Sequence, residues 1–477
     1  MHDVNFRQFL DVLSRQGELK EVDQEVDWNL EASAILAMIY RMEGPAVLFN
    51  KIKDYPQGYR MAGALYSGPR RQPWRKMAMG LGIDPDEGYK KWQQEFNRRL
   101  DHPIKPVIVQ DGFCKEVILI GEEADIFKLP IPYVHLGDGG RYGGTLPVTV
   151  TRHPVRDWVN AGNYRWMAHD KQRLGGDFQP GQHMADMYYV YEKKGESMPF
   201  CMAMGVNPAL DIAAGVSLPV GANEYDVAGG LQEEPLQLVK AETNDLLVPA
   251  DAEIIIEGEV LPHERLEEGP FGEYDGFMTT RLPQPVYRIK AITHRRNPIL
   301  PVAPEGYRFN DTGAMSCGIL SPVLQWRLEK EGFKDVLFYN IPEASWAWPV
   351  VATKPISDTD LGKLISAVWS VPTMGWLDKL LLVDDDVDIT STEELLEILG
   401  TRLRAERVYE SKPNKPISFI AAWASEEELR RGLAGALTYD CVTRPEEEKP
   451  EKITIETLFK PETQKWLDNF WLRAVSR

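Results

Sequence analysis

Residues 236–257, LQLVKAETNDLLVPADAEIIIE, contain two apolar runs on either side of a polar segment. The runs at residues 236–241 and 253–257 have the length of β-strands and are rich in Leu, Val and Ile. Between them lie Asn244, Asp245 and Pro249, residue types that favour tight turns. The segment therefore predicts two short strands joined by an ordered turn.

The same pattern extends through the middle of the chain. Short apolar runs separated by Gly, Pro and Asp recur, and we expect strands at residues 104–109, 117–120, 146–150, 200–204 and 286–293. Helical insertions are expected at residues 183–192 and 223–231. Many short strands at this spacing favour an all-β barrel or sandwich.

The two ends of the chain are different. The first hundred residues mix helix and strand signals, and strands alternate with helices after about residue 310, which is typical of an α/β domain. We therefore expect four regions: an N-terminal α+β segment (1–105), a strand-rich domain (106–310), a C-terminal α/β oligomerisation domain (311–445), and a linker with a terminal helix (446–477).

Composition excludes several classes of function. The chain has 477 residues and a formal net charge of −18, which disfavours binding to a nucleic-acid backbone. There is no apolar run of about 18 residues, so no membrane span is expected, and the N-terminus lacks the apolar core of a signal peptide. The four cysteines are far apart, which argues against a disulfide framework or a zinc–thiolate site. We expect a cytoplasmic protein.

The segment EGPFGE places Glu268 and Glu273 at the two ends of a Gly-Pro-Phe-Gly turn. Proline fixes one backbone angle and glycine permits unusual ones, so the loop is conformationally specified. Two carboxylates on a rigid turn can serve as acid, base or charge partner. Taken alone, they are better explained as two solvated turn residues.

Other segments offer ligands for a cation. The segment NAGNYR contains Asn160, Gly162 and Arg165, Gln182 precedes His183, and Glu242 follows a predicted strand. The oxygen and nitrogen atoms of Asn160, His183 and Glu242 suit Mn²⁺ or Mg²⁺ better than zinc. Each residue alone has an ordinary structural explanation, as does the glycine-rich loop at residues 139–144, which is either a tight turn or a close backbone approach to a ligand.

The order of these motifs resembles the UbiD family of (de)carboxylases. N-x-G-x-Y-R, then Q-H, then ETNDL, then EGPFGE follow one another as in that family, and the pattern is most similar to its phenylphosphate carboxylase and anaerobic aryl-acid branch. The resemblance implies an α+β fold in which a flavin-reductase-like split β-barrel is flanked by the N-terminal segment and the C-terminal domain. It also implies prenylated FMN held within residues 106–310, with Mn²⁺ (or Mg²⁺) and K⁺.

The resemblance also implies roles for single residues. Arg165, Glu268 and Glu273 would form the catalytic Glu-Arg-Glu set. Asn160, His183 and Glu242 would bind the metal, and the cofactor would contact these three together with Gly162, Arg165 and Gln182. A lysine that contacts the cofactor in many members is replaced here by Ala436, so that either Arg430 or Arg431 takes its place or the cofactor is held differently.

The expected activity is reversible, non-oxidative decarboxylation of an aromatic or heteroaromatic acid. Expected partners are the acid substrate and CO₂, a flavin prenyltransferase that supplies the cofactor, and further copies of the chain in a dimer or hexamer. Two alternatives stay open at this point. One is a non-catalytic UbiD-like subunit of a multisubunit carboxylase, which the missing lysine favours, and the other is an unrelated flavin reductase on a split β-barrel.

Overall fold

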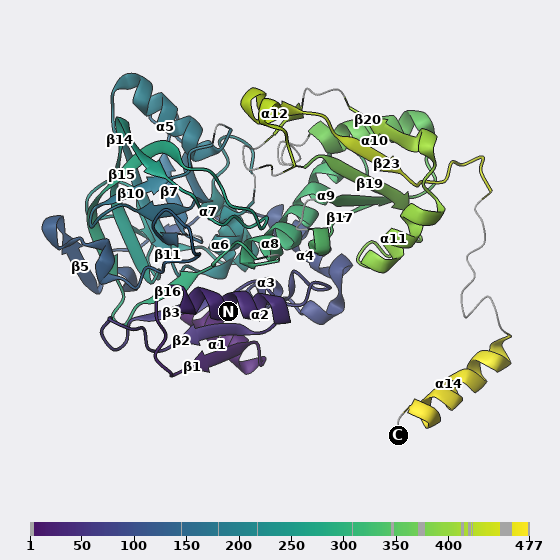
Figure 1. Cartoon of the computed structure of the whole chain (residues 1–477), viewed down its shortest axis with the longest axis horizontal. Coiled ribbons are helices and arrows are strands. Elements are labelled where there is room, and N and C mark those ends of the chain that lie inside the picture. Colours follow the sequence, from purple (N-terminus) through teal and green to yellow (C-terminus); the bar gives the residue numbers. More distant parts are fainter. Residues whose placement is uncertain are drawn as a thin grey trace.

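The computed structural model describes residues 4–475 except 145, 180, 217, 308, 345–347, 371–376, 412–414, 418–420, 422 and 449–459. Its elements form two bodies side by side, one around a large curved sheet and one around a smaller sheet, with the N-terminal elements beneath the first (Figure 1). Helix α14 stands apart from both. No helix among the described residues is long and apolar enough to cross a membrane.

The N-terminal part combines a four-stranded sheet with four helices. Asn5 caps the first helix in a reciprocal capping box, and Phe6, Phe9 and Leu13 on one face of this helix are buried. The sheet order is β1-β2-β3-β16, so its last strand comes from more than two hundred residues later in the chain. The elements are α1 (Phe6–Arg15), β1 (Leu19–Val22), α2 (Glu31–Met42), β2 (Ala46–Phe49), β3 (Arg60–Gly63), α3 (Arg75–Gly80), α4 (Tyr89–Leu100) and β16 (Ile299–Val302).

The central part is a nine-stranded sheet of order β6-β9-β10-β15-β14-β11-β7-β8, with β5 also paired to β15. A small sheet, β13-β12-β4, and three helices complete it. The elements are β4 (Val107–Ile108), β5 (Val117–Ile120), β6 (Arg141–Gly144), β7 (Val148–Arg152), β8 (Val159–Asn163), β9 (Trp166–Ala168), β10 (Arg173–Gly176), α5 (His183–Lys194), β11 (Met198–Met204), α6 (Pro208–Ala214), α7 (Glu224–Gln232), β12 (Gln237–Lys240), β13 (Leu247–Pro249), β14 (Ile254–Glu268) and β15 (Leu282–His294).

This arrangement is a mixed α/β fold. Among the described strands, β6 and β8 end the large sheet and do not pair with one another, so the sheet is not a closed barrel. The expected split β-barrel is therefore represented by an open, curved sheet. The predicted strand at residues 104–109 shrinks to Val107–Ile108, whereas the strand predicted at 253–257 continues to Glu268 through its pairing with β15. The second half of that strand is polar and partly exposed, so no apolar run indicated it.

The C-terminal part alternates strands and helices, as predicted. Its five-stranded sheet has the order β17-β18-β19-β23-β20, with parallel pairing at the centre and antiparallel pairing at both edges. The elements are α8 (Asp311–Met315), a π-helical turn (Ser316–Leu320), α9 (Ser321–Lys330), β17 (Val336–Asn340), β18 (Pro349–Thr353), α10 (Asp358–Ser370), β19 (Lys379–Asp384), α11 (Thr392–Thr401), β20 (Val408–Glu410), β21 (Lys415–Pro416), α12 (Glu426–Arg431), β22 (Leu433–Ala434), β23 (Leu437–Asp440) and α14 (Pro461–Val475). Short 3₁₀ turns occupy Pro85–Glu87, Phe113–Lys115, Gly121–Glu123, Ile126–Lys128, Pro342–Ala344 and Ala405–Arg407.

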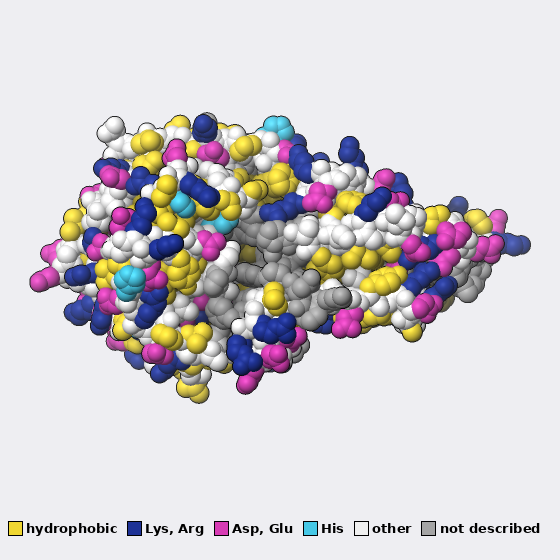
Figure 2. Space-filling model, turned by 90° about the horizontal axis from the view of Figure 1, so that it is seen from above, with side chains coloured by type: hydrophobic (Ala, Val, Ile, Leu, Met, Phe, Trp, Pro, Cys, Tyr) yellow, Lys and Arg dark blue, Asp and Glu magenta, His cyan; other side chains and the backbone are white. Residues whose placement is uncertain are grey.

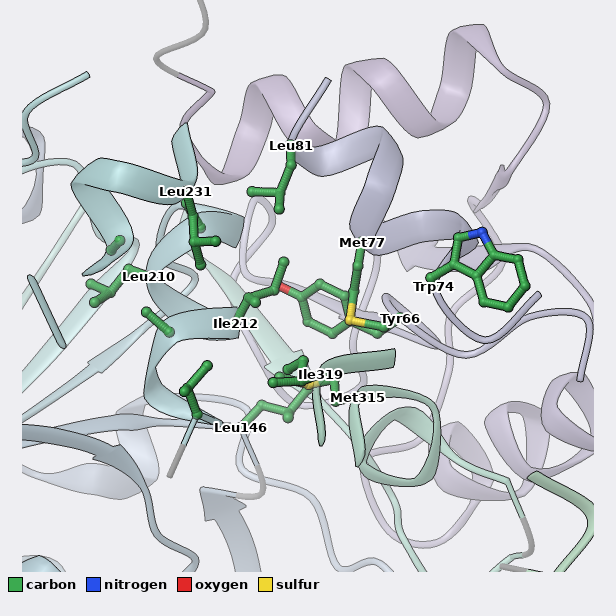
Figure 3. Packing of buried hydrophobic residues seen from close by; sticks show 14 of the residues in the cluster. Tyr66, Trp74, Met77, Leu81, Leu146, Leu210, Ile212, Leu231, Met315 and Ile319 are labelled. Carbon is green, nitrogen blue, oxygen red and sulfur yellow. The ribbon is translucent and has the colours of Figure 1, made fainter. Parts of the chain in front are cut away.

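A continuous apolar core joins the parts. Met77 on α3, Ile212 on α6 and Ile319 on the π-helical turn converge around Tyr66, and all are buried (Figure 3). These residues come from three of the four expected regions, whose boundaries lie at residues 105 and 310. The division of the chain at those positions stays a prediction, since the packing is continuous across them.

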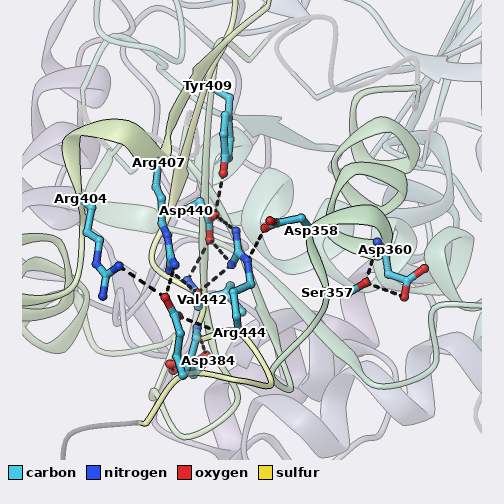
Figure 4. A network of polar contacts seen from close by, with 12 residues as sticks. Ser357, Asp358, Asp360, Asp384, Arg404, Arg407, Tyr409, Asp440, Val442 and Arg444 are labelled. Atoms are coloured by element: carbon cyan, nitrogen blue, oxygen red, sulfur yellow. Dashed lines mark hydrogen bonds and ion pairs between the residues drawn. The ribbon is translucent and has the colours of Figure 1, made fainter.

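A buried arginine organises the C-terminal sheet. Arg444 donates from Nη2 to Asp440 Oδ2 at 2.5 Å, from Nη1 to the Val442 carbonyl at 2.8 Å and from Nε to Asp358 Oδ1 at 2.5 Å (Figure 4). The Asp440 side chain is fully buried, and it also accepts from the Tyr409 hydroxyl at 3.1 Å. The network ties the end of β23 to the start of α10.

Replacement of Arg444 should destabilise this half of the protein. Arg444→Ala leaves Asp440 buried without its cation, so we expect a loss of about 3 kcal/mol in the free energy of unfolding, measured by urea denaturation. The control is Arg404→Ala, because the Arg404 side chain is 57% exposed and its ion pair with Glu447 should contribute less than about 0.5 kcal/mol. Equal stability of the two variants would contradict the assigned role.

Candidate functional site

A cavity of about 670 Å³ lies between the large sheet and the helices that begin the C-terminal part. Its walls carry residues of β8, α5, α7, the EGPFGE loop and α8 to α9. Seen from above, the molecular surface is hollowed between the two bodies (Figure 2). The cavity has the size of a cofactor or substrate site. The polar and charged residues in its lining include Asn160, Asn163, Arg165, Asp177, Gln179, Gln182, His183, Glu224, Glu273 and Glu305.

Arg165 is the central cation of this cavity. It follows β8, its side chain is 11% exposed, and it donates to both oxygens of Glu268, from Nη2 at 3.0 Å and from Nε at 3.2 Å. It also pairs with Glu273, and its Nη1 lies 3.4 Å from Asp177 Oδ2. The structure thus brings Arg165, Glu268 and Glu273 together, as the sequence predicted.

Asp177 is a member of this cluster that no sequence motif indicates. It lies just after β10, is buried, and accepts from Gln179 Nε2 at 2.9 Å. In the sequence it directly follows Leu-Gly-Gly, and this context contains no motif that indicates a charged site. Only the pairing of β10 with β9 and β15 places it opposite Arg165.

Burial and charge act in opposite directions in this cluster. Burial alone would lower the pKa of Arg165, but Asp177 and Glu268 outweigh it and raise the pKa, so the guanidinium keeps its charge. Burial raises the pKa of the Asp177 carboxyl, against the effect of Arg165. Tyr142 donates to Glu268 Oε1 at 2.8 Å, and burial together with Glu268 raises the pKa of this phenol, which keeps it a donor.

The glycine-rich loop at residues 139–144 supports the EGPFGE loop. The Gly139 amide donates to the Pro270 carbonyl at 2.8 Å, and a Cβ at Gly139 would lie 2.0 Å from the Gly269 carbonyl oxygen. Only glycine permits this approach. Arg141 points elsewhere, to the Ile131 carbonyl and the Tyr55 hydroxyl. The backbone of the glycine-rich loop therefore approaches the EGPFGE loop closely. The close approach to a ligand that the sequence left open is not what requires glycine at residue 139.

Asn160 and His183 lie in the same cavity wall. Asn160 is on β8 and accepts from the Tyr164 hydroxyl at 2.9 Å, and His183 begins α5. Burial lowers the pKa of His183, which favours the neutral imidazole that binds metals. Gly162 and Gln182 also line the cavity, and their contact with the cofactor stays a prediction.

Glu242 is not part of this wall, which corrects the prediction for the third metal ligand. Its Oε1 pairs with Lys115 Nζ at 2.6 Å, and its amide donates to Glu257. The Thr243 amide and hydroxyl donate to the same carboxylate, and Asn244 accepts from the Leu246 amide, so ETND forms a turn between β12 and β13. The motif is a structural turn here, and Glu242 is absent from the cavity lining.

Glu224 occupies the position that was expected for Glu242. It is the first residue of α7, is 3% exposed, and lines the cavity. It accepts from Asn160 Nδ2 at 3.2 Å and from the Ala161 amide at 3.0 Å. The sequence contains one signal for it: a carboxylate directly after the capping residue Asn223 of a predicted helical insertion.

The donor set of this wall is one amide, one imidazole and one carboxylate. Among the described residues, no group of three His, Cys, Asp or Glu side chains could hold a metal ion. A cation bound here would therefore need the Asn160 oxygen in addition to His183 and Glu224. Such a mixed oxygen and nitrogen set suits Mn²⁺ or Mg²⁺.

Ala436, which stands where many family members have a lysine, is not among the cavity-lining residues. Ala436 is buried, and its amide donates to Ser411 Oγ at 2.9 Å. Neither Arg430 nor Arg431 is among the cavity-lining residues, whereas Arg327 on α9 is. If an arginine replaces the lysine, the geometry favours Arg327 over the two arginines of α12.

Comparisons with known proteins relate this chain to a family of carboxy-lyases. Three family models match in order: the 3-octaprenyl-4-hydroxybenzoate carboxy-lyase N-terminal domain (residues 10–96), its Rift-related domain (106–308) and its C-terminal domain (315–424). A pyrrole-2-carboxylic acid decarboxylase of Pseudomonas aeruginosa is 30% identical over 92% of this chain and 91% of its own length. The ferulic acid decarboxylase 1 of Saccharomyces cerevisiae is 27% identical over 94% and 92%.

Solved structures give the same result. The UbiD-class enzyme HmfF from Pelotomaculum thermopropionicum, in complex with FMN, superposes with a TM-score of 0.82 at 26% identity, over 96% of this chain and 99% of the other. The vanillic acid decarboxylase of Sedimentibacter hydroxybenzoicus, in its closed form, superposes with a TM-score of 0.85 at 26% identity, over 98% of both chains.

The charge cluster around Arg165 makes a prediction about stability. In Arg165→Met, three buried carboxyls lose their cation, and their pKa values should rise above those of the unfolded chain. Stability should then be lost as the pH rises through the new values, so the deficit relative to the wild type should be about 3 kcal/mol at pH 8 and smaller at pH 5. Urea denaturation at both pH values measures it.

The matched control is Arg173→Met. The Arg173 side chain is 46% exposed and pairs with Asp170 in the same turn, so this variant should differ from the wild type by less than about 0.5 kcal/mol at either pH. A deficit in Arg165→Met that is the same at pH 5 and pH 8 would mean that its carboxyls stay charged without Arg165.

Proposed function

The chain belongs to the UbiD family of carboxy-lyases, and we propose that it catalyses the reversible, non-oxidative decarboxylation of an aromatic or heteroaromatic acid with prenylated FMN. The observation that carries this proposal is the buried pairing of Arg165 with Glu268 and Glu273 in a cavity of flavin size. Similar enzymes are decarboxylases of pyrrole-2-carboxylic, ferulic and vanillic acids, which supports this substrate class.

We infer that the cavity wall of Asn160, His183 and Glu224 holds the phosphate end of the cofactor. A flavin phosphate is anionic, so a divalent cation held by this wall would offset part of the negative charge of the phosphate and Glu224. Asn160, His183 and Glu224 would hold Mn²⁺ (or Mg²⁺), and K⁺ would lie beside it. Gly162 and Gln182 would contact the cofactor from the same wall. HmfF structures with FMN and with prenylated FMN support the choice of flavin.

The chemistry divides between the cofactor and the protein. Loss of CO₂ from an aromatic ring leaves a carbanion that side chains cannot stabilise, and prenylated FMN, when bound, supplies the electron sink. Arg165 would orient the substrate carboxylate through its charge. Glu268, buried and held by Tyr142 and Arg165, would fix the guanidinium. Glu273, after taking up a proton from solvent, would donate it to the ring carbon that loses CO₂ and would be left as the carboxylate paired with Arg165.

Asp177 extends this set. Its carboxylate lies 3.4 Å from Arg165 Nη1 and is held by Gln179, so it would restrict the guanidinium to one orientation. We assign it a positioning role, because its contacts are to Arg165 and Gln179. The large sheet would provide one side of the flavin site, as an open form of the split β-barrel.

Assembly and supply of cofactor complete the proposal. A flavin prenyltransferase would provide prenylated FMN. The chain would form a dimer or hexamer, and the existence of an evolved dimeric form of HmfF supports self-association. Helix α14 carries Trp466 and Phe470 stacked on each other at 59% and 48% exposure, an apolar surface suited to contact with a neighbouring copy.

The alternative is a structural subunit without catalysis. One observation favours it, the buried Ala436 in place of the lysine. Against it stands the complete Arg165, Glu268 and Glu273 set, which a structural subunit does not need. The test is production of the protein with and without a flavin prenyltransferase, followed by visible spectra and anaerobic CO₂ release from a panel of aromatic acids. No flavin binding and no CO₂ release under either condition would support the structural subunit.

Glu224 and Glu242 should differ in metal and flavin binding. Glu224→Ala should lose bound metal and flavin together, because it removes the charged ligand of the cavity wall. Glu242→Ala should keep both, since its partner is Lys115 outside the cavity. Metal analysis and the flavin absorbance of purified protein measure the outcome. Loss of metal in Glu242→Ala with retention in Glu224→Ala would make Glu242 the metal ligand.

Glu273→Gln should separate binding from chemistry. The amide keeps the size of the side chain but cannot deliver a proton, so turnover should fall by about 10² to 10⁴-fold while flavin binding is retained. The matched control is Glu267→Gln, because Glu267 lies on the exposed side of β14. Steady-state CO₂ release and ¹³C-bicarbonate exchange measure both variants. Parental rates in Glu273→Gln would exclude it as the proton donor.

A further inference from the structure

Glu305 is a cavity-lining acid that has no part in the proposed chemistry. It lines the cavity and follows β16 in the chain. It lies next to the loop that carries Glu273, because the amide of the following residue, Gly306, donates to the Glu273 carbonyl at 3.0 Å. His135 packs against both segments, since Cβ atoms at Gly272 or Gly306 would lie 2.7 Å or less from its ring. Glu305 is therefore positioned by the same contacts that position Glu273.

The two carboxyl oxygens of Glu305 have different surroundings. Oε1 accepts from the Thr312 hydroxyl at 2.6 Å. Oε2 is buried and has no hydrogen-bond partner among the described residues, although the side chain lines the cavity and the residue is only 4% exposed. An unsatisfied buried polar atom is costly, and it is found in proteins where a ligand satisfies it.

The backbone at Glu305 is also unusual. Its φ of 23° lies in the left-handed region that residues other than glycine rarely adopt. Two contacts hold the Glu305 backbone in this conformation. One joins His135 Nε2 to the Glu305 carbonyl at 3.3 Å, and the other joins the Gly306 amide to the Glu273 carbonyl. Strain of this kind is concentrated at functional sites.

Charge determines which hydrogen-bonding role Oε2 has. Burial, and then the neighbouring carboxylate of Asp311, raise the pKa of Glu305 to about 8, against the effect of Thr312. Asp311 is itself buried and accepts from the Tyr66 and Ser67 amides and the Tyr40 hydroxyl. At pH 7 Glu305 is therefore mostly a neutral acid. Thr312 uses Oε1 as an acceptor, which leaves the proton on Oε2.

We propose that Glu305 is a specificity-determining residue, whose Oε2–H donates a hydrogen bond to a phenolic hydroxyl on the ring of the substrate. Thr312 is its positioning residue. The inference rests on the proposed function and narrows its substrate class from aromatic acids in general to hydroxylated ones. An acid that lacks the hydroxyl leaves the donor unsatisfied, and a site built for a hydrogen bond rejects such analogues.

Matched pairs of acids test this role. The probes are benzoic acid against 3- and 4-hydroxybenzoic acid, and cinnamic acid against 4-hydroxycinnamic acid. Binding to the flavin-loaded enzyme is measured at pH 7 by isothermal titration calorimetry, beside CO₂ release. In the wild type we expect at least one hydroxylated member to bind about tenfold tighter or more than its partner.

Two substitutions at Glu305 separate hydrogen bonding from shape. Glu305→Leu should bring the affinity ratio of that pair close to one. Glu305→Gln should keep most of this affinity ratio. The Thr312 hydroxyl can donate to the amide oxygen, which leaves the amide N–H₂ group where Oε2 lies in the wild type and keeps a hydrogen-bond donor there. Should Glu305→Leu fail to fold, Thr312→Val is the substitute. It should lower the ratio by releasing the carboxyl from its orientation.

The outcomes are distinct. Equal binding of both members of every pair by the wild type, binding of none, or an unchanged ratio in Glu305→Leu or Thr312→Val would overturn the inference. A wild type that prefers the hydroxylated acid in binding but releases CO₂ from no acid would refute the proposed function and leave the binding role of Glu305 intact.

Discussion

The structure of the site depends on one buried guanidinium. Arg165 is surrounded by Glu268, Glu273 and Asp177, which come from the end of β14, the loop that follows it and the end of β10. A single isolated charge could not be buried here, and three carboxylates without a cation could not be buried together. The pairings of β9 with β10, β10 with β15 and β15 with β14 bring these groups to one place. The large sheet is therefore the scaffold of the charge cluster.

The sequence was most informative where a local motif contains its own geometry. Glu268 and Glu273 are separated by a short turn whose conformation the sequence specifies. The motif N-x-G-x-Y-R places Asn160 on a strand and Arg165 just after its end. These residues meet at one cavity in the structure, as predicted. Glu242 shows the limit of this reasoning, because its motif is equally suited to a β-turn, and the turn is what forms. Glu224 and Asp177 belong to no motif, and only long-range packing gives them their positions.

Secondary structure was predictable wherever apolar residues show a clear period. The helices α5 and α7 and the alternation after residue 310 follow the expected pattern. Strands β8 (VNAGN) and β10 (RLGG) were not predicted because glycine and asparagine have low strand propensity, and their neighbours in the sheet stabilise them. Strand β8 carries residues of the cavity wall, and β10 is followed directly by the cavity-lining residue Asp177. Glycine is required there, since a Cβ at Gly162 would lie 2.7 Å from the Tyr164 ring.

The pairing of β3 with β16 has a consequence for synthesis of the protein. Arg60 in β3 is opposite Ile299 in β16, so the N-terminal sheet lacks its last strand until the ribosome has made the large sheet. At a synthesis rate of about 5 to 20 residues per second, this interval lasts roughly ten to fifty seconds. During that time β3, with its buried Met61 and Ala62, presents an unpaired edge to solvent. The N-terminal sheet can therefore be completed only after the central part of the chain has been synthesised.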